Sequence, residues 1–123
     1  MILPTSNLLM TLNHANLCVT SVPEARAFLE KYFGLNFAGG NDGLTVLIAD
    51  GGFVLTLMKA KRDEPVVYPG FFHIGFFVES KEVVDELNAR LREDGFEVNL
   101  PTQEHAYNFY MMAPGGFRIE VGA

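Results

Sequence analysis

The sequence predicts an α+β fold built from two copies of one βαβββ module, joined in a single domain of residues 1–123. A glycine turn occurs twice, as ADGGF at 49–53 and APGGF at 113–117, an offset of 64 residues (113 minus 49). An apolar run with histidine at its third position precedes each copy, as LNHANLCVT at 12–20 and FFHIGFFVE at 71–79. Each run is followed by a serine and a helical pattern, so the whole unit is repeated.

The first module is expected over residues 10–59. Its apolar strand at 12–20 leads to Ser21, which forms a capping-box pattern with Glu24 and therefore predicts the start of a helix. Apolar residues then recur at helical spacing as far as Gly34, a residue type that commonly ends helices. Three strands complete the module, and we expect them at residues 35–37, 44–49 and 53–58.

The second module is expected over residues 71–122, with a helix that starts after Ser80 and ends at Gly95. Between the modules, residues 60–70 are charged and contain two prolines, which is typical of a linker. One module has a single apolar sheet face and cannot stand alone, so two must pair, within one chain or between two chains. The remaining strands are expected at residues 71–79, 96–98, 108–113 and 117–121.

Composition excludes several classes of function. The chain is 49% hydrophobic and has a formal net charge of -6, so it is globular and poorly suited to nucleic acid. The sequence contains no run of about 18 apolar residues, so it predicts no membrane span. The N-terminus has no basic residue before its apolar stretch, which makes it a poor signal peptide. Because Cys18 is the only cysteine, no internal disulfide can form, and we expect a cytoplasmic protein.

The repeat also indicates where a site would lie. Pairing two copies creates a pseudo-two-fold axis, and residues at equivalent positions converge near it. His14 is equivalent to His73, and Thr56 is equivalent to Glu120. Asn16 shares strand parity with His14 and is expected to line the same pocket. A site on the axis would hold two histidines, one carboxylate and one hydroxyl.

Glu120, His14 and His73 each have an alternative interpretation that involves no site. Glu120 shares strand parity with Arg118, and such an alternation of charges is ordinary on the exposed face of a sheet. His14 and His73, each taken alone, are compatible with a histidine satisfied within the core. Their joint occurrence at equivalent positions of a repeat favours the site.

Three stretches, LNH at 12–14, FH at 72–73 and PGGFRIE at 114–120, give the chain a resemblance to the vicinal oxygen chelate superfamily of glyoxalases, bleomycin-resistance proteins and dioxygenases. In that family, paired βαβββ modules bind a divalent metal between them. The resemblance implies that His14, His73 and Glu120 are the ligands here, while Thr56 stands where glyoxalase I has an acid. Such ligands suit Zn, Fe, Mn, Ni or Co alike.

The resemblance implies a divalent-metal enzyme of the lyase, isomerase or dioxygenase type, acting on a small substrate chelated through oxygens. Tyr110, ten residues before Glu120, would be an acid or base, and His105 would lie near the pocket. A homodimer is expected, and the modules could be exchanged between its chains. The alternative is a metal-independent protein of the bleomycin-resistance kind, which binds a drug or metabolite without turnover.

Overall fold

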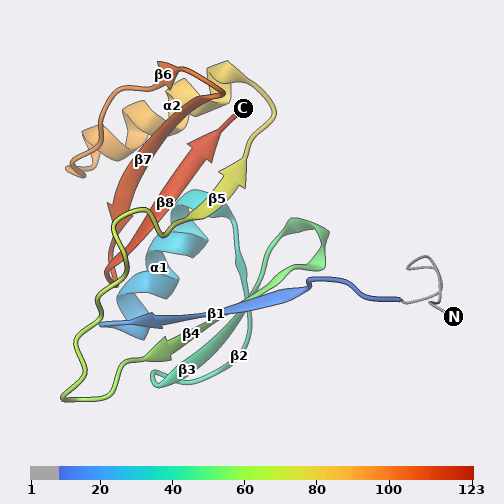
Figure 1. Cartoon of the computed structure of the whole chain (residues 1–123), viewed down its shortest axis with the longest axis vertical. Helices are drawn as coiled ribbons and strands as arrows, with labels where there is room; N and C mark the ends of the chain where they lie inside the picture. The colour runs from blue at the N-terminus through green and yellow to red at the C-terminus, as the bar shows by residue number, and fades with distance from the viewer. Residues whose placement is uncertain (1–8) are drawn as a thin grey trace, which may run out of the picture.

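The computed structural model describes residues 9–123, which form two modules arranged one above the other (Figure 1). The expectation about a signal peptide falls largely on residues 1–8, which lie outside the described residues. The elements of the first module are β1 (His14–Val19), α1 (Val22–Phe33), β2 (Asn36–Gly40), β3 (Leu44–Ile48), the short helix η2 (Asp50–Gly52) and β4 (Val54–Lys59). Those of the second are β5 (Ile74–Phe77), α2 (Lys81–Glu93), β6 (Thr102–Gln103), β7 (Tyr107–Ala113) and β8 (Phe117–Gly122).

Each module forms one four-stranded mixed sheet. The strand orders are β1-β4-β3-β2 and β5-β8-β7-β6, so the two sheets have the same topology. The first strand of each module runs parallel to the last, and the other neighbours are antiparallel. The predicted α+β fold of two βαβββ modules is therefore confirmed. Within the described residues, β1 and β5 each have one strand neighbour and form an edge of their sheet.

The register of the strand pairs is also the same in the two sheets. Thr56 lies opposite Asn16 on β1, and Glu120 lies opposite Gly75 on β5, in agreement with offsets of 59 (75 minus 16) and 64 (120 minus 56). Position 56 also faces Val46 on β3, as position 120 faces Tyr110 on β7. Thr56 and Glu120 therefore occupy the same point of their respective sheets.

Side-chain caps fix the start of both helices. The Ser21 hydroxyl accepts a hydrogen bond from the Glu24 amide at 3.3 Å, and Ser80 does the same for the Val83 amide at 3.3 Å. At the end of α1, Gly34 adopts φ 67°, a left-handed conformation that glycine reaches without strain. Both helix starts expected from the sequence are confirmed.

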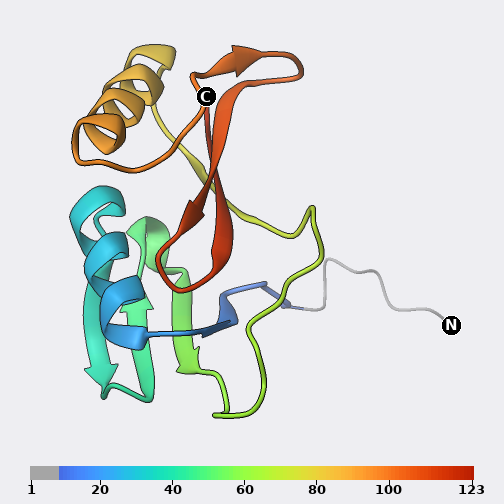
Figure 2. The same ribbon diagram turned by 90° about the vertical axis from the view of Figure 1, so that its left-hand side faces the viewer.

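The two modules share one buried core. The Thr20 amide donates to the Gly115 carbonyl at 3.0 Å, which joins the end of β1 to the second glycine turn. Phe33 at the end of α1 stacks on Phe76 of β5 with ring centroids 4.2 Å apart. Figure 2 shows both helices on one side of the molecule, with α2 above α1. Helix α1 therefore contacts both modules.

One predicted strand is wrong. Residues 96–98 form no strand, and the outer strand of the second sheet is the two-residue β6, which pairs only with the start of β7. The Asn88 amide donates to the Asn99 carbonyl at 2.8 Å, so α2 holds this segment beside itself. Pro101 follows, and proline lacks the amide that a ladder requires.

No helix in the part of the chain that the structure describes is both long and apolar enough to cross a membrane.

Candidate metal centre

Strand β8 separates the core from an open sheet face. Phe117, Ile119 and Val121 are fully buried, while Arg118 and Glu120 alternate with them and are half-buried. The same alternation in β1 buries Leu17 and leaves His14 and Asn16 exposed. In both modules, therefore, the expected site residues lie on the sheet face turned away from the core.

The carboxylate of Glu120 is held by three side chains. The Asn108 amide donates to Oε2 at 2.7 Å, and the Tyr110 hydroxyl lies 3.2 Å from the same oxygen. On the other side, Nε2 of His73 lies 3.4 Å from Oε1. Gly75 is directly opposite, and a side-chain carbon there would lie 3.4 Å from Oε1. The missing side chain at Gly75 keeps this oxygen accessible.

The ring of His73 is fixed by two contacts. Its Nδ1 lies 2.9 Å from the Phe71 carbonyl oxygen, which can only accept a hydrogen bond. In the neutral ring, Nδ1 therefore carries the proton and the lone pair of Nε2 points toward Glu120. The Tyr110 ring packs edge-on against the imidazole, with centroids 5.4 Å apart. Metal-binding histidines are commonly oriented through their second nitrogen in this way.

The environment of Tyr110 makes its hydroxyl a weaker acid than that of an ordinary tyrosine. Burial raises the pKa of Tyr110 above its ordinary value, and the negative charge and hydrogen bond of Glu120 raise that pKa further. The positive charge of Arg118 acts in the opposite direction and offsets part of the increase. The Tyr110 hydroxyl therefore stays protonated at neutral pH, as an ordinary tyrosine does, and donates a hydrogen bond to the Glu120 carboxylate.

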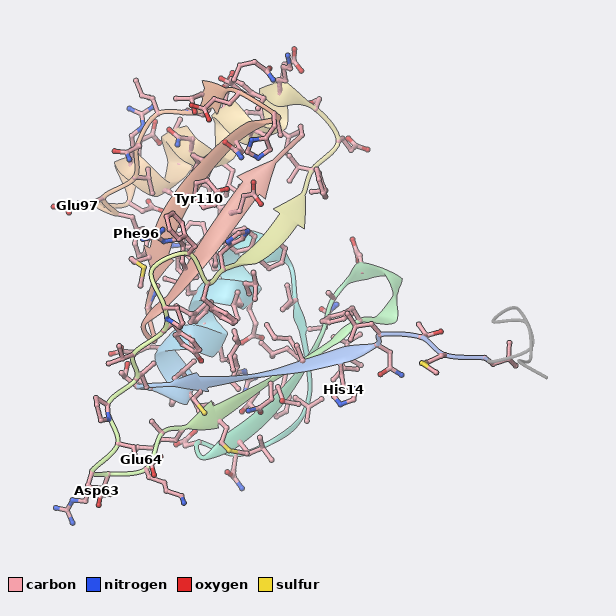
Figure 3. All side chains as sticks on the ribbon, viewed as in Figure 1. His14, Asp63, Glu64, Phe96, Glu97 and Tyr110 are labelled. Atoms are coloured by element: carbon pink, nitrogen blue, oxygen red, sulfur yellow. The ribbon has the colours of Figure 1, made fainter. Side chains whose placement is uncertain are left out.

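The first module carries three more of the predicted residues, His14, Asn16 and Thr56. His14 is exposed at the start of β1, with Nδ1 2.8 Å from Oδ1 of Asn13. The Thr56 hydroxyl donates to Oδ1 of Asn16 at 2.6 Å. Figure 3 shows His14 on the lower module and Tyr110 on the upper one. The pair of Asn16 and Thr56 is thus the counterpart of Gly75 and Glu120 in the other sheet.

The structure brings together only part of the predicted set. His73, Glu120 and Tyr110 are in contact, whereas His14 belongs to a different sheet. Among residues 9–123, no group of three His, Cys, Asp or Glu side chains lies close enough to hold one metal ion. His105 is exposed in the loop between β6 and β7.

Sequence reasoning missed Asn108. This residue is only 6% exposed, and its amide fixes the orientation of Glu120. A signal for it was present, because Asn108 lies two residues before Tyr110 on one strand and must share its face. An asparagine among the aromatic and apolar residues of β7 needs a polar partner.

The donor set of the second module fits one half of a metal centre. Imidazole and carboxylate are the ligand types of the two-histidine, one-carboxylate sites that bind divalent transition metals. Nε2 of His73 and Oε1 of Glu120 are adjacent, and both are bonded through their other atoms to Phe71 and Asn108. The fold and this donor pair define a protein of two βαβββ modules with a histidine and a carboxylate side by side on the open face of its second sheet.

Comparison with known proteins agrees with this class. A family model, the Glyoxalase/Bleomycin resistance protein/Dioxygenase superfamily, matches residues 11–121. The chain belongs to this superfamily.

Two solved structures resemble this chain to different degrees in sequence and in fold. A solved structure described as a possible glyoxalase from Bacillus cereus is 51% identical, with a TM-score of 0.86, and the match covers 93% of this chain and 99% of that one. Lactoylglutathione lyase from Agrobacterium tumefaciens is 22% identical, with a TM-score of 0.74 over 94% of both chains, and indicates the fold alone.

Two curated proteins are also similar. The glutathione transferase FosA from Serratia marcescens is 25% identical over 115 residues, which cover 93% of this chain and 81% of that protein. A 2,2',3-trihydroxybiphenyl dioxygenase from Sphingomonas paucimobilis is 39% identical over 59 residues. That second match covers 44% of this chain and only 20% of the dioxygenase.

Proposed function

We propose that this chain is a divalent-metal enzyme that acts on a small substrate bound through oxygen atoms. The ligands are His73 and Glu120 of one chain and His14 of a second copy, so the working unit is a homodimer with exchanged modules. The observation that carries the proposal is the oriented pair, with His73 Nε2 3.4 Å from Glu120 Oε1.

Hydrogen bonds around this pair support its role as a ligand set. Glu120 is bonded to Asn108 and Tyr110 through Oε2, which leaves Oε1 beside the imidazole. A surface ion pair would need no such support, and it would contribute about 0–1 kcal/mol to stability. Preorganisation of both donors is the property that metal binding requires.

A second copy is needed because the proposed site has three ligands and one chain brings only two of them, His73 and Glu120, together. His14 occupies the position in its module that His73 occupies in the other, yet it lies outside the group around Glu120. Strands β1 and β5 each have a free edge in the described residues. The open face of the first sheet also exposes large apolar side chains, namely Leu44, Ile48 and Met58. Pairing with the second sheet of another copy would cover this face and bring His14 to Glu120.

The chain's own residues define what the site does to a substrate. A bound divalent ion would supply Lewis-acid chemistry, since it polarises the oxygen atoms of a ligand. Tyr110 Oη holds a proton at neutral pH and would donate it on the side of Glu120. The apolar residues of the first sheet would exclude water from the remaining part of the substrate. This combination suits lyase, isomerase or dioxygenase chemistry.

Metal content of the purified, untagged chain tests the proposal. Mass spectrometry of the parent protein is expected to give near-stoichiometric metal after incubation with Zn, Fe, Mn, Ni or Co. His73→Ala and Glu120→Gln should both lose it, because each removes a ligand. Glu64→Gln is the matched control, since Glu64 lies in the linker, away from Tyr110 (Figure 3).

Retention of metal in both ligand variants would refute the assignment of His73 and Glu120. Failure of the parent to bind any of the five ions would instead favour the metal-independent alternative. In that case the apolar open face and the net charge of -6 would suit a protein that binds a cationic drug or metabolite without turnover.

A further inference from the structure

Arg118 is a cation without a partner next to the candidate metal centre. It precedes Glu120 by two residues on β8, shares its sheet face and lies opposite Met112 of β7. Its side chain is half-buried, yet it forms no ion pair and no hydrogen bond with the other described residues. A guanidinium has several donors in one plane, and a half-buried one is usually bonded. The free donors of Arg118 are therefore available to a ligand.

A groove of about 770 Å³ adjoins this guanidinium. It lies between β7 and residues 96–99, where the second sheet lacks a full outer strand. The corresponding place in the first sheet is filled by β2. The residues that line the groove include Arg92, Phe96, Asn99, Tyr110, Met112 and Arg118. Tyr110 and Arg118 therefore both lie in the wall of one groove.

We infer that Arg118 binds a carboxylate group of the substrate, and that the groove beside β7 admits this group. The inference rests on the proposed function, because it places the carboxylate next to the atoms that would react at Tyr110 and Glu120. Arg118 would then determine specificity, since it selects anionic substrates over neutral ones of the same shape.

Charge and geometry favour a carboxylate over other groups. A guanidinium binds the two oxygens of a carboxylate through parallel hydrogen bonds. The chain has a net charge of -6, so a single arginine can balance one negative charge more readily than the two of a phosphate. Arg92, the other cation of the groove, already donates to Asn88 Oδ1 at 2.9 Å. Glu97 also lines the groove, so a ligand with one negative charge is favoured over a ligand with two.

Nuclear magnetic resonance of the metal-free chain tests the anion site directly. Titration with benzoate should shift the Nε–H signal of Arg118 in a saturable manner, while benzyl alcohol should leave it in place. Arg118→Gln removes the signal, and the shifts of neighbouring amides on β7 should disappear with it. Arg62→Gln is the control, because it makes the same change of charge in the linker. Absence of a saturable shift, or an equal response to benzyl alcohol, would overturn the inference.

A pair of chelating probes separates this inference from the proposed function. With the Zn²⁺-loaded chain, 3,4-dihydroxybenzoate should bind about tenfold more tightly than catechol, as expected of a charge-assisted hydrogen-bonded pair. Arg118→Gln should abolish this ratio of dissociation constants, and Arg62→Gln should keep it. Equal binding of both probes by the parent would overturn the carboxylate site and leave the metal site intact. A benzoate shift at Arg118 in a chain that binds none of Zn, Fe, Mn, Ni and Co would support the anion site and refute the metal enzyme.

Discussion

Asn108 of β7 and Glu120 of β8 are diagonal neighbours across the two strands, with the amide nitrogen of Asn108 2.7 Å from Oε2 of the Glu120 carboxylate. The contact is possible because Asn108 lies opposite Gly122, where a side-chain carbon would come within 3.4 Å of Asn108 Cβ. The Asn108 side chain is nearly buried, so the packing around it restricts the rotation of its amide. The orientation of Glu120 is therefore set by a residue that would not itself contact the metal.

Asn108→Ala should weaken metal binding without removing a ligand. Loss of the amide frees Glu120 to rotate, and changes of this kind typically lower metal affinity by about 10–100-fold. The free energy of unfolding should fall by about 1 kcal/mol as the hydrogen bond is lost. Competition with a chromogenic chelator measures the affinity, and thermal or urea unfolding measures the stability.

The matched control is Asn88→Ala, which also removes a buried asparagine. Asn88 bonds to Asn99 and Arg92, away from Glu120. The Asn88→Ala variant should lose about as much stability as Asn108→Ala and keep the metal affinity of the parent. Equal losses of affinity in the two variants would show that Asn108 acts only through general stability.

Glu120→Gln should lower the pKa of Tyr110 in the metal-free chain. Burial makes the largest contribution to the raised pKa of Tyr110, and the charge of Glu120 adds to it, since a carboxylate opposes formation of a phenolate. Removing that charge leaves burial in place, so the pKa should move toward the ordinary value near 10 but stay above it. The chemical shift of the labelled tyrosine Cζ against pH gives the measurement. An unchanged or higher pKa would contradict the contact between Tyr110 and Glu120.

The two glycine turns predict a difference in stability between equivalent substitutions. Gly51 and Gly115 both have positive φ, so alanine is strained at either place, at a cost of about 1 kcal/mol. Around Gly51 there is open space, whereas a side-chain carbon at Gly115 would lie 3.1 Å from Ala25 Cβ and 3.2 Å from Val19 Cβ. Gly115→Ala should therefore cost about 1–3 kcal/mol more than Gly51→Ala, because it also overpacks the core. Urea unfolding at one protein concentration tests this, and equal losses would contradict the close packing of the second turn.

The repeat explains how much of the fold could be predicted from the sequence. The glycine turns and capping serines are local signals, and together they gave both modules and both helix starts. Because the register repeats, the equivalence of Thr56 and Glu120 followed from sequence offsets alone. The repeat predicted that His73 and Glu120 lie at one site, and the family resemblance implied that they are metal ligands.

The differences between the copies could not be predicted in the same way. The strand expected at residues 96–98 failed because a tertiary hydrogen bond from Asn88 holds the segment, and no local pattern reports such a bond. Arg118 looked like one half of an exposed charge alternation, yet the groove beside it arises from that missing strand. The groove beside Arg118 thus lies where the second module departs from the repeat.

Complementation between two inactive variants tests the central claim, that each site combines His14 of one copy with His73 and Glu120 of another. His14→Ala and His73→Ala should each bind no metal as homodimers. In a heterodimer with exchanged modules, one site lacks both histidines and the other is intact. After unfolding and joint refolding of equal amounts, metal content should recover to about a quarter of the parental value, since half of the dimers are mixed. No recovery in a mixture with proven heterodimers would contradict the account and place all the ligands within one chain.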